Sequence, residues 1–330
     1  MNNKVRLPFK TNPLSVMYHN LAFPLGVIEG NAKCDITPWL CHKFINCIFN
    51  SNVKNKFSIS LSDNWGISEQ INFCQQMHLY FDSYNKIGID IIQMLKAMLV
   101  NGYYVNGDYN EEYVPGKQAY GIEYFPHDYL LIGFDDEKEV FNSVGYLTKQ
   151  LVNFEIPYKN MELALKTLKS NKPILNFYKY NTDKDFKVDV NKIISGLKDY
   201  ISSSNSTQHH AQGFFYGLEA VIRLGEHIIN DGEKSNFDHR YTRGLMEHKH
   251  IMVKRIEYLC NNQYLSNNKC IYSAYRVFEY AKIIHNLGIR FKLLRDQNLL
   301  KEIMAIIQKM KNIELEYLAS VKGELELFDT

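Results

Sequence analysis

A cysteine and a distant histidine are the residues of this chain best suited to nucleophilic catalysis. Cys34 follows the small and polar segment 30–33, and His127 stands 93 residues further on, between Pro126 and Asp128. A thiolate attacks acyl carbonyl carbons, and a neighbouring imidazole removes the thiol proton. Because the two residues lie far apart in the sequence, only folding can bring them together. The pair predicts acyl transfer or hydrolysis.

The thiol needs an element that lowers its pKa. Apolar side chains recur at helical spacing after Cys34, and Pro38 falls where the first helical turn would be. Proline is tolerated there because the first N–H groups of a helix have no intrahelical partner. The pattern predicts a helix over 34–49 that begins at Cys34, so that the positive end of the helix dipole favours the thiolate.

The histidine needs a rigid element and a group that fixes its tautomer. Residues 127–134 and 139–146 predict a β-hairpin around the turn at 135–138. Asn142, on the return strand, is the expected orienting residue, with Ser143 and Asp128 as alternatives. A regular ladder pairs His127 nearer Tyr146, so Asn142 requires a shifted turn or a bulge to face the imidazole.

The remaining pattern predicts an α+β unit at 1–185 and an all-helical unit at 186–330, which could also pack together as one body. Expected elements of the first unit are strands at 57–61, 103–108, 151–156 and 174–180, and helices at 67–81, 87–100 and 161–169. Expected helices of the second unit are 190–202, 213–230, 239–261, 271–287 and 297–321.

With these elements in place, the chain resembles the papain-like cysteine peptidase superfamily. His127, the aliphatic run 130–132, Gly133-Phe134-Asp135-Asp136 and Val140-Phe141-Asn142 are similar to the hairpin of butirosin biosynthesis protein H-type acyltransferases and of the peptidase-like domains of bacteriocin exporters. The resemblance implies a papain-like core, in which a helix bearing Cys34 packs on an antiparallel sheet, with an added C-terminal helical unit. It also implies a catalytic triad of Cys34, His127 and Asn142.

Shorter motifs extend the resemblance along most of the chain. They are Tyr103–Asp108 with Tyr113–Gly116, Phe215–Leu218, Glu247–Lys249 and Arg255–Leu259. One departure concerns the oxyanion hole, because papain-like peptidases carry a glutamine shortly before the cysteine and this chain has none at 28–31. Asn31 or backbone N–H groups are the expected substitutes.

The resemblance implies amide-bond formation in specialised-metabolite biosynthesis. Relatives of the butirosin type, and the amide synthetase of closthioamide-type biosynthesis, take an acyl group from a carrier-protein thioester and give it to an amine. The expected partners are an acyl or peptidyl carrier protein and a small amine acceptor, with Asp108 as a contact for a cationic amine. The chain has no GxxxxGK loop, so activation by ATP is not expected, nor is any cofactor.

Three alternatives stay open. A cysteine peptidase or amidase would use the same residues with water as the acceptor, and a binding module would use the fold without catalysis. A metal enzyme could use His209-His210 or Glu247-His248-Lys249-His250. Neither segment has the HExxH spacing, and adjacent histidines point to different faces of a helix, so no metal site is expected.

Bulk properties limit the class of protein. The 330 residues are 45% hydrophobic, which is enough to build a full core, and the net charge of +2 comes without a block of like charges. Nucleic acid is therefore not an expected partner, and no apolar run is long enough for a membrane span.

The cysteines and the terminal segments of the sequence indicate the cellular compartment and the oligomeric state. Six cysteines without a CxxC pair, and an N-terminal segment without the apolar core of a signal peptide, predict a cytoplasmic protein with reduced thiols. The amphipathic pattern near the C-terminus permits a homodimer.

Overall fold

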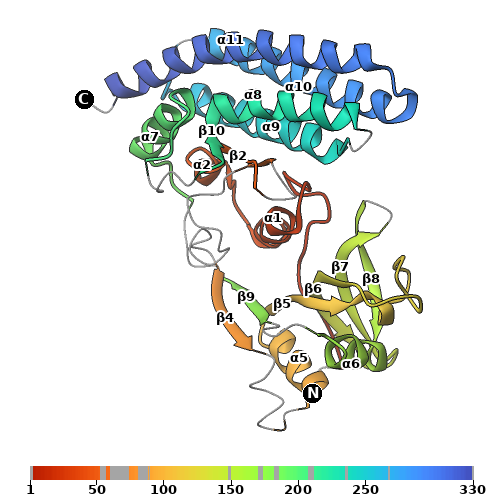
Figure 1. The fold of residues 1–330 in the computed structure, drawn as a ribbon. Coiled ribbons are helices and arrows are strands. Elements are labelled where there is room, and N and C mark those ends of the chain that lie inside the picture. Colours follow the sequence, from red (N-terminus) through yellow and green to blue (C-terminus); the bar gives the residue numbers. More distant parts are fainter. Residues whose placement is uncertain are drawn as a thin grey trace. The chain divides into compact units, whose positions relative to one another are not determined.

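The computed structural model divides the chain into two compact units. It describes residues 3–52, 57–59, 74–80, 88, 90–147, 150–169, 174–181, 186–206, 212–234, 237–266 and 268–328. Unit 1 comprises residues 1–33 and 66–184, and unit 2 comprises residues 34–65 and 185–330. The fold is of the α+β class (Figure 1). Unit 2 includes residues 34–65, which the sequence predicts within the first unit.

Unit 1 is built on an antiparallel half-barrel sheet with strand order β4-β9-β5-β6-β7-β8, and β1 pairs with β6. Its strands are β1 (Lys4–Arg6), β4 (Cys74–Tyr80), β5 (Tyr103–Asn110), β6 (Pro126–Asp135), β7 (Val140–Leu147), β8 (Gln150–Pro157) and β9 (Ile174–Tyr180). Its helices are α1 (His19–Asn31), α5 (Ile91–Val100), η1 (Glu111–Tyr113) and α6 (Tyr158–Lys166). One core cluster joins the apolar faces of α5 and α6 to β5, β6 and β7.

The β6–β7 hairpin is confirmed, and it contains a bulge. Asp135 pairs with Val140 across the turn, and the register shifts between Leu131 and Gly133. At Gly133 the backbone of β1 approaches so closely that an added Cβ would lie 2.1 Å from the Val5 carbonyl oxygen. Glycine is required there because any side chain would displace the paired strand. The shift fixes which residues of β7 face the beginning of β6.

Helix α1 was not predicted, and it carries a residue of the candidate site. Its residues from Leu21 to Ile28 are all buried, so the chain shows no polar face to mark a helix. Gly26 and Gly30 lie one turn apart against Phe9, where an added Cβ would meet Phe9 atoms at 2.2 and 2.8 Å. Lys10 N also donates to the Gly26 carbonyl at 3.0 Å. These contacts fix α1 on the segment that precedes it, and Phe23 and Val27 pack on the sheet.

Unit 2 is dominated by helices, as the sequence predicts for the C-terminal half. They are α2 (Thr37–Leu40), α7 (Val190–Ile201), α8 (Gly217–Glu233), α9 (His239–Asn261), α10 (Lys269–Leu294) and α11 (Gln297–Phe328). The last four helices run alongside one another (Figure 1). A three-stranded antiparallel sheet joins them, in the order β10 (Phe214–Tyr216), β2 (Cys47–Asn50), β3 (Phe57–Ile59).

The helix predicted over 34–49 is wrong. Only Thr37–Leu40 is helical, and Cys47–Asn50 is a strand. Phe44 adopts a φ of 57°, which a right-handed helix does not allow. The buried Arg255 guanidinium donates to the carbonyl oxygens of Cys41 and Lys43 at 2.8 and 2.5 Å, so it caps the short helix where the predicted one would continue.

Most other predicted elements are confirmed, with ends that differ by up to seven residues. The segment 67–81 is an exception, because its described part, β4, is a strand rather than a helix. The helix predicted at 213–230 begins only at Gly217, because Phe214–Tyr216 form strand β10. The strand predicted at 57–61 is described for Phe57–Ile59 only. Within the described residues, no helix combines the length and the apolar character that crossing a membrane requires.

Buried histidines make the stability of unit 2 depend on pH. Burial lowers the pKa of His42 and of His285 to about 4, and lowers the pKa of His248 well below its usual value. The unfolded chain therefore binds protons first as the pH falls below about 6.5, the ordinary histidine value. We expect the urea midpoint of unit 2 to be constant above that pH and to fall progressively between about pH 6.5 and 4.

A glutamine variant provides the control for this pH dependence. His285→Gln removes one of the titrating histidines of unit 2, so its urea midpoint should fall less steeply over the same pH range than that of the wild type. An unchanged slope in His285→Gln would assign the acid sensitivity to other groups.

Candidate functional site

His127 lies on the second residue of β6, where the sequence predicts it. It pairs with Tyr109 of β5, and its ring stacks on Phe125 with a centroid distance of 5.9 Å. The imidazole also lies edge-on to the ring of His19, the first residue of α1, at 4.7 Å between centroids. Two segments separated by more than 100 residues thus bring two imidazoles together within unit 1.

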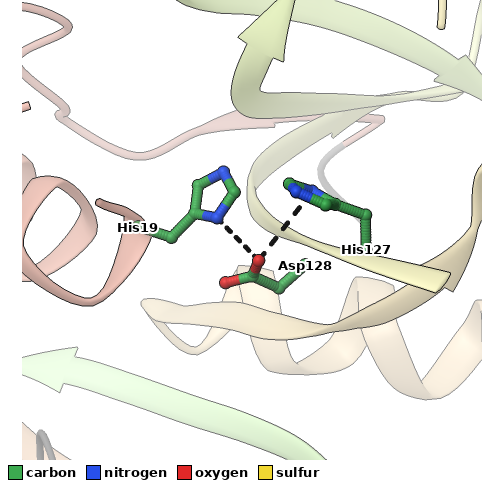
Figure 2. Close-up of side chains that lie close together, drawn as sticks. All are labelled: His19, His127 and Asp128. Carbon is green, nitrogen blue, oxygen red and sulfur yellow. Dashed lines mark ion pairs between the residues drawn. The ribbon is translucent and has the colours of Figure 1, made fainter. Parts of the chain in front are cut away.

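Asp128 connects the two imidazoles (Figure 2). His19 Nδ1 lies 2.7 Å from Asp128 Oδ1, which is a hydrogen-bonded ion-pair distance, and His127 Nδ1 lies 3.9 Å from the same oxygen. Burial opposes ionisation of Asp128, but the hydrogen bond from His19 outweighs it, and the pKa of Asp128 lies below its usual value. The carboxylate therefore stays ionised and fixes the orientation of His19.

Two ring nitrogens of this cluster have no hydrogen-bond partner. His19 Nε2 and His127 Nδ1 are both buried and unpartnered. Burial, together with the neighbouring His19 imidazole, lowers the pKa of His127, so its neutral form is favoured. Buried polar atoms normally have partners, so these two nitrogens point to a ligand or a reacting group.

A second polar network adjoins His127. Glu111 Oε1 lies 3.8 Å from His127 Nδ1 and 3.7 Å from Lys117 Nζ, and it accepts a hydrogen bond from the Tyr129 hydroxyl. Lys117 lies over the Tyr129 ring and donates to the Tyr146 carbonyl oxygen at 2.7 Å. Burial lowers the pKa of Lys117 to about 8. This network supports one side of the His127 ring.

Asp108, the expected contact for an amine, borders the cluster. It pairs with Asp128 across β5 and β6, and its side chain is exposed. Partial desolvation of its carboxyl group by the neighbouring residues and the charge of Asp128 raise the pKa of Asp108. Two carboxylates facing each other repel, so a cation between them would be favoured.

Cys34 does not stand at the start of a helix. It is exposed, three residues after the end of α1 and three before α2, and it belongs to unit 2, whereas His127 belongs to unit 1. The expected helix dipole is therefore absent at Cys34. The residue that begins a helix beside His127 is His19.

Asn142 is not placed to orient His127. It is buried and pairs with Gly133, because the turn sets that register, and the bulge beyond Gly133 shifts the rest of the ladder by a single residue only. Gly133 lies six positions after His127 along β6, which corresponds to about 20 Å along the strand. Ser143 pairs with Leu131, so neither residue of β7 reaches the imidazole. Of the three candidate orienting residues, Asp128 lies closest to the His127 imidazole, but it forms its hydrogen bond with His19.

Asn31 is engaged in packing at the far end of α1. Its amide donates to the Val27 carbonyl oxygen and to the Tyr104 hydroxyl, both at 2.7 Å. Twelve helical positions, or about 18 Å, separate it from His19. An oxyanion-binding role beside His127 is therefore excluded by its position.

The histidine motif of α9 serves packing. His248 Nε2 lies 2.9 Å from the Ile45 carbonyl oxygen, His250 stacks on Phe278, and Glu247 pairs with Arg243. These side chains face different partners, as adjacent positions of a helix must. His209 and His210 lie outside the described residues.

His19 is the site residue that sequence reasoning missed. A histidine directly before a fully apolar run was the available signal, because polar residues at the start of a buried helix face away from its core. Pro24 concealed the helix, since it removes one intrahelical hydrogen bond. No protein-family model and no curated protein matches this chain, so the residues of unit 1 and their geometry carry the functional argument.

Proposed function

We propose that the chain forms an amide bond from an acyl thioester and an amine, with the His19–Asp128 pair as its acid–base centre. The observation that carries the proposal is the buried and unpartnered His19 Nε2, on a ring whose Nδ1 lies 2.7 Å from Asp128. A carboxylate on Nδ1 fixes the tautomer that leaves Nε2 free to accept a proton.

The reaction follows from this geometry. His19 Nε2 accepts a proton from the amine while the amine nitrogen attacks the thioester carbonyl carbon. The C–N bond forms, the C–S bond breaks, and the proton passes from His19 to the departing thiolate. Asp128 stabilises the imidazolium that exists between these steps. The thiol of the thioester donor has a much lower pKa than an alcohol, so its thiolate leaves readily. The donor therefore needs no further activation.

Asp108 and His127 complete the proposed site. The protonated end of a diamine would be held between the carboxylates of Asp108 and Asp128, which face each other across two strands, and its other, neutral amine would be the nucleophile. His127 packs edge-on against His19 and limits the rotation of its ring. The resemblance of the hairpin to acyltransferases of the butirosin type supports a carrier-protein thioester as donor.

The proposal differs from a mechanism through Cys34, and the two can be separated. Wild type and Cys34→Ala are mixed with acyl thioesters, with and without diamines, and the products are identified by mass spectrometry. We expect both proteins to form the amide at similar rates, without an acyl adduct on the protein. An adduct on wild type together with loss of product in Cys34→Ala would establish the covalent route instead. Free acid formed equally with and without amine would establish a hydrolase.

A further inference from the structure

We propose that His19, His127 and Asp128 form a binding site for one divalent transition-metal ion. Each residue offers one ligand atom, and these three atoms lie within 4.8 Å of one another. Figure 2 shows the rings of His19 and His127 on either side of the Asp128 carboxylate. Two imidazoles and one carboxylate are a ligand set that zinc and similar ions use in proteins, with further positions open to water or substrate.

The distances between the three ligand atoms fit a bound metal ion after small side-chain rotations. Ligand atoms about 2.1 Å from a tetrahedral ion lie about 3.4 Å apart. The two distances to Asp128 Oδ1, 2.7 Å from His19 and 3.9 Å from His127, lie on either side of that value. All three residues come from α1 and β6 of unit 1, whose apolar side chains share one core cluster, so the ligands are preorganised.

The surroundings suit a metal ion better than a simple ion pair. His127 Nδ1 is buried without a hydrogen-bond partner, so an available lone pair is directed into the cluster. Tyr146 and Phe23 pack against the His19 ring at centroid distances of 4.7 and 4.9 Å, and Phe125 stacks on His127. These aromatic side chains fix the ring orientations, as the supporting residues of metal sites do.

Bound metal would regulate the proposed reaction, and in this respect the inference rests on the proposed function. The ion would bind the Asp128 carboxylate and His19 Nδ1, and so would break the hydrogen bond that fixes the catalytic tautomer of His19. Binding would therefore inhibit amide formation, and it would also link the start of α1 to β6 and stabilise unit 1.

The test measures binding without substrate. Zn²⁺ is titrated calorimetrically into the full chain, Co²⁺ serves as a spectroscopic probe, and thermal unfolding is followed with and without Zn²⁺. We expect one ion per chain, and a loss of affinity of at least about 10–100-fold in Asp128→Asn and His127→Gln. The control His78→Ala replaces an exposed histidine of β4 and should bind as wild type does. Circular dichroism shows whether each variant is folded.

Binding that is absent in wild type, or unchanged in folded Asp128→Asn, would overturn the metal site. Failure of the proposed function gives a different result, since a chain without acyltransferase activity would still bind the ion. Activity that increases with Zn²⁺ would retain the site and overturn the acid–base role of His19.

Discussion

Replacement of His19 by alanine is expected to lower the rate of amide formation by about 10²–10⁴-fold, the usual contribution of a general base. Its Nε2 is the proposed proton acceptor, and alanine leaves Asp128 without its hydrogen-bond partner. Asp128→Asn should lose activity on a similar scale, because the amide favours the wrong tautomer of His19. The rates are measured with an acyl thioester and a diamine at saturating concentrations.

Added imidazole separates a chemical role of His19 from a structural one. The cavity left by His19→Ala lies beside Asp128 and would hold a free imidazole in place of the side chain. Partial recovery of the rate with imidazole supports proton transfer, and no recovery in a folded variant counts against it. If His127→Ala abolishes activity while His19→Ala retains it, the base is His127, as the sequence predicts.

Removal of Glu314 is expected to destabilise unit 2 by about 3–5 kcal/mol, the cost of leaving a buried charge unpaired. Lys249 Nζ lies 2.8 Å from both carboxylate oxygens of Glu314, and both side chains are fully buried. Tyr200 joins them, because it accepts from Lys249 at 2.5 Å and donates to Glu314 at 3.0 Å. Glu314→Leu removes the acceptor and leaves the Lys249 ammonium without compensation.

Two further variants make this result specific. The double variant Lys249→Met/Glu314→Leu removes both charges, and its stability should return to within about 1–2 kcal/mol of wild type or exceed it. Glu326→Gln breaks an exposed pair with Lys322 on the same helix and should cost less than about 1 kcal/mol. Urea denaturation followed by circular dichroism measures all three variants. Equal losses in the single and double variants would show that packing, rather than charge, dominates.

The sequence predicts elements well where polar and apolar residues alternate or recur regularly. The β6–β7 hairpin and the helices of the C-terminal half follow from such patterns. The helix predicted over 34–49 is wrong because a fully buried strand such as β2 is also a continuous apolar run. Periodicity cannot distinguish such a run from a buried helix. The left-handed φ of Phe44 depends on tertiary contacts, among them the hydrogen bonds of Arg255, that no local pattern encodes.

The candidate site was predictable in part. His127 and its strand follow from the hairpin, and Asp128 was among the alternatives for the orienting residue. His19 was not predictable as its partner, because α1 meets β6 through tertiary packing, in which Phe23 shares a core cluster with Leu130 and Ile132. Asn142 lies opposite Gly133 because the turn fixes its register, and the bulge that could have changed this lies beyond it towards His127.

The division of the chain has a consequence for the order of folding during synthesis. Unit 2 is assembled from two segments, 34–65 and 185–330, and most of unit 1 lies between them. Strand β2 therefore emerges from the ribosome long before its partner β10, and Arg255 emerges more than 200 residues after the carbonyl groups it binds. Unit 1 can fold first, whereas strands β2 and β3 stay exposed to solvent until the helices of unit 2 have been synthesised. For the same reason, no single cut of the chain releases either unit whole.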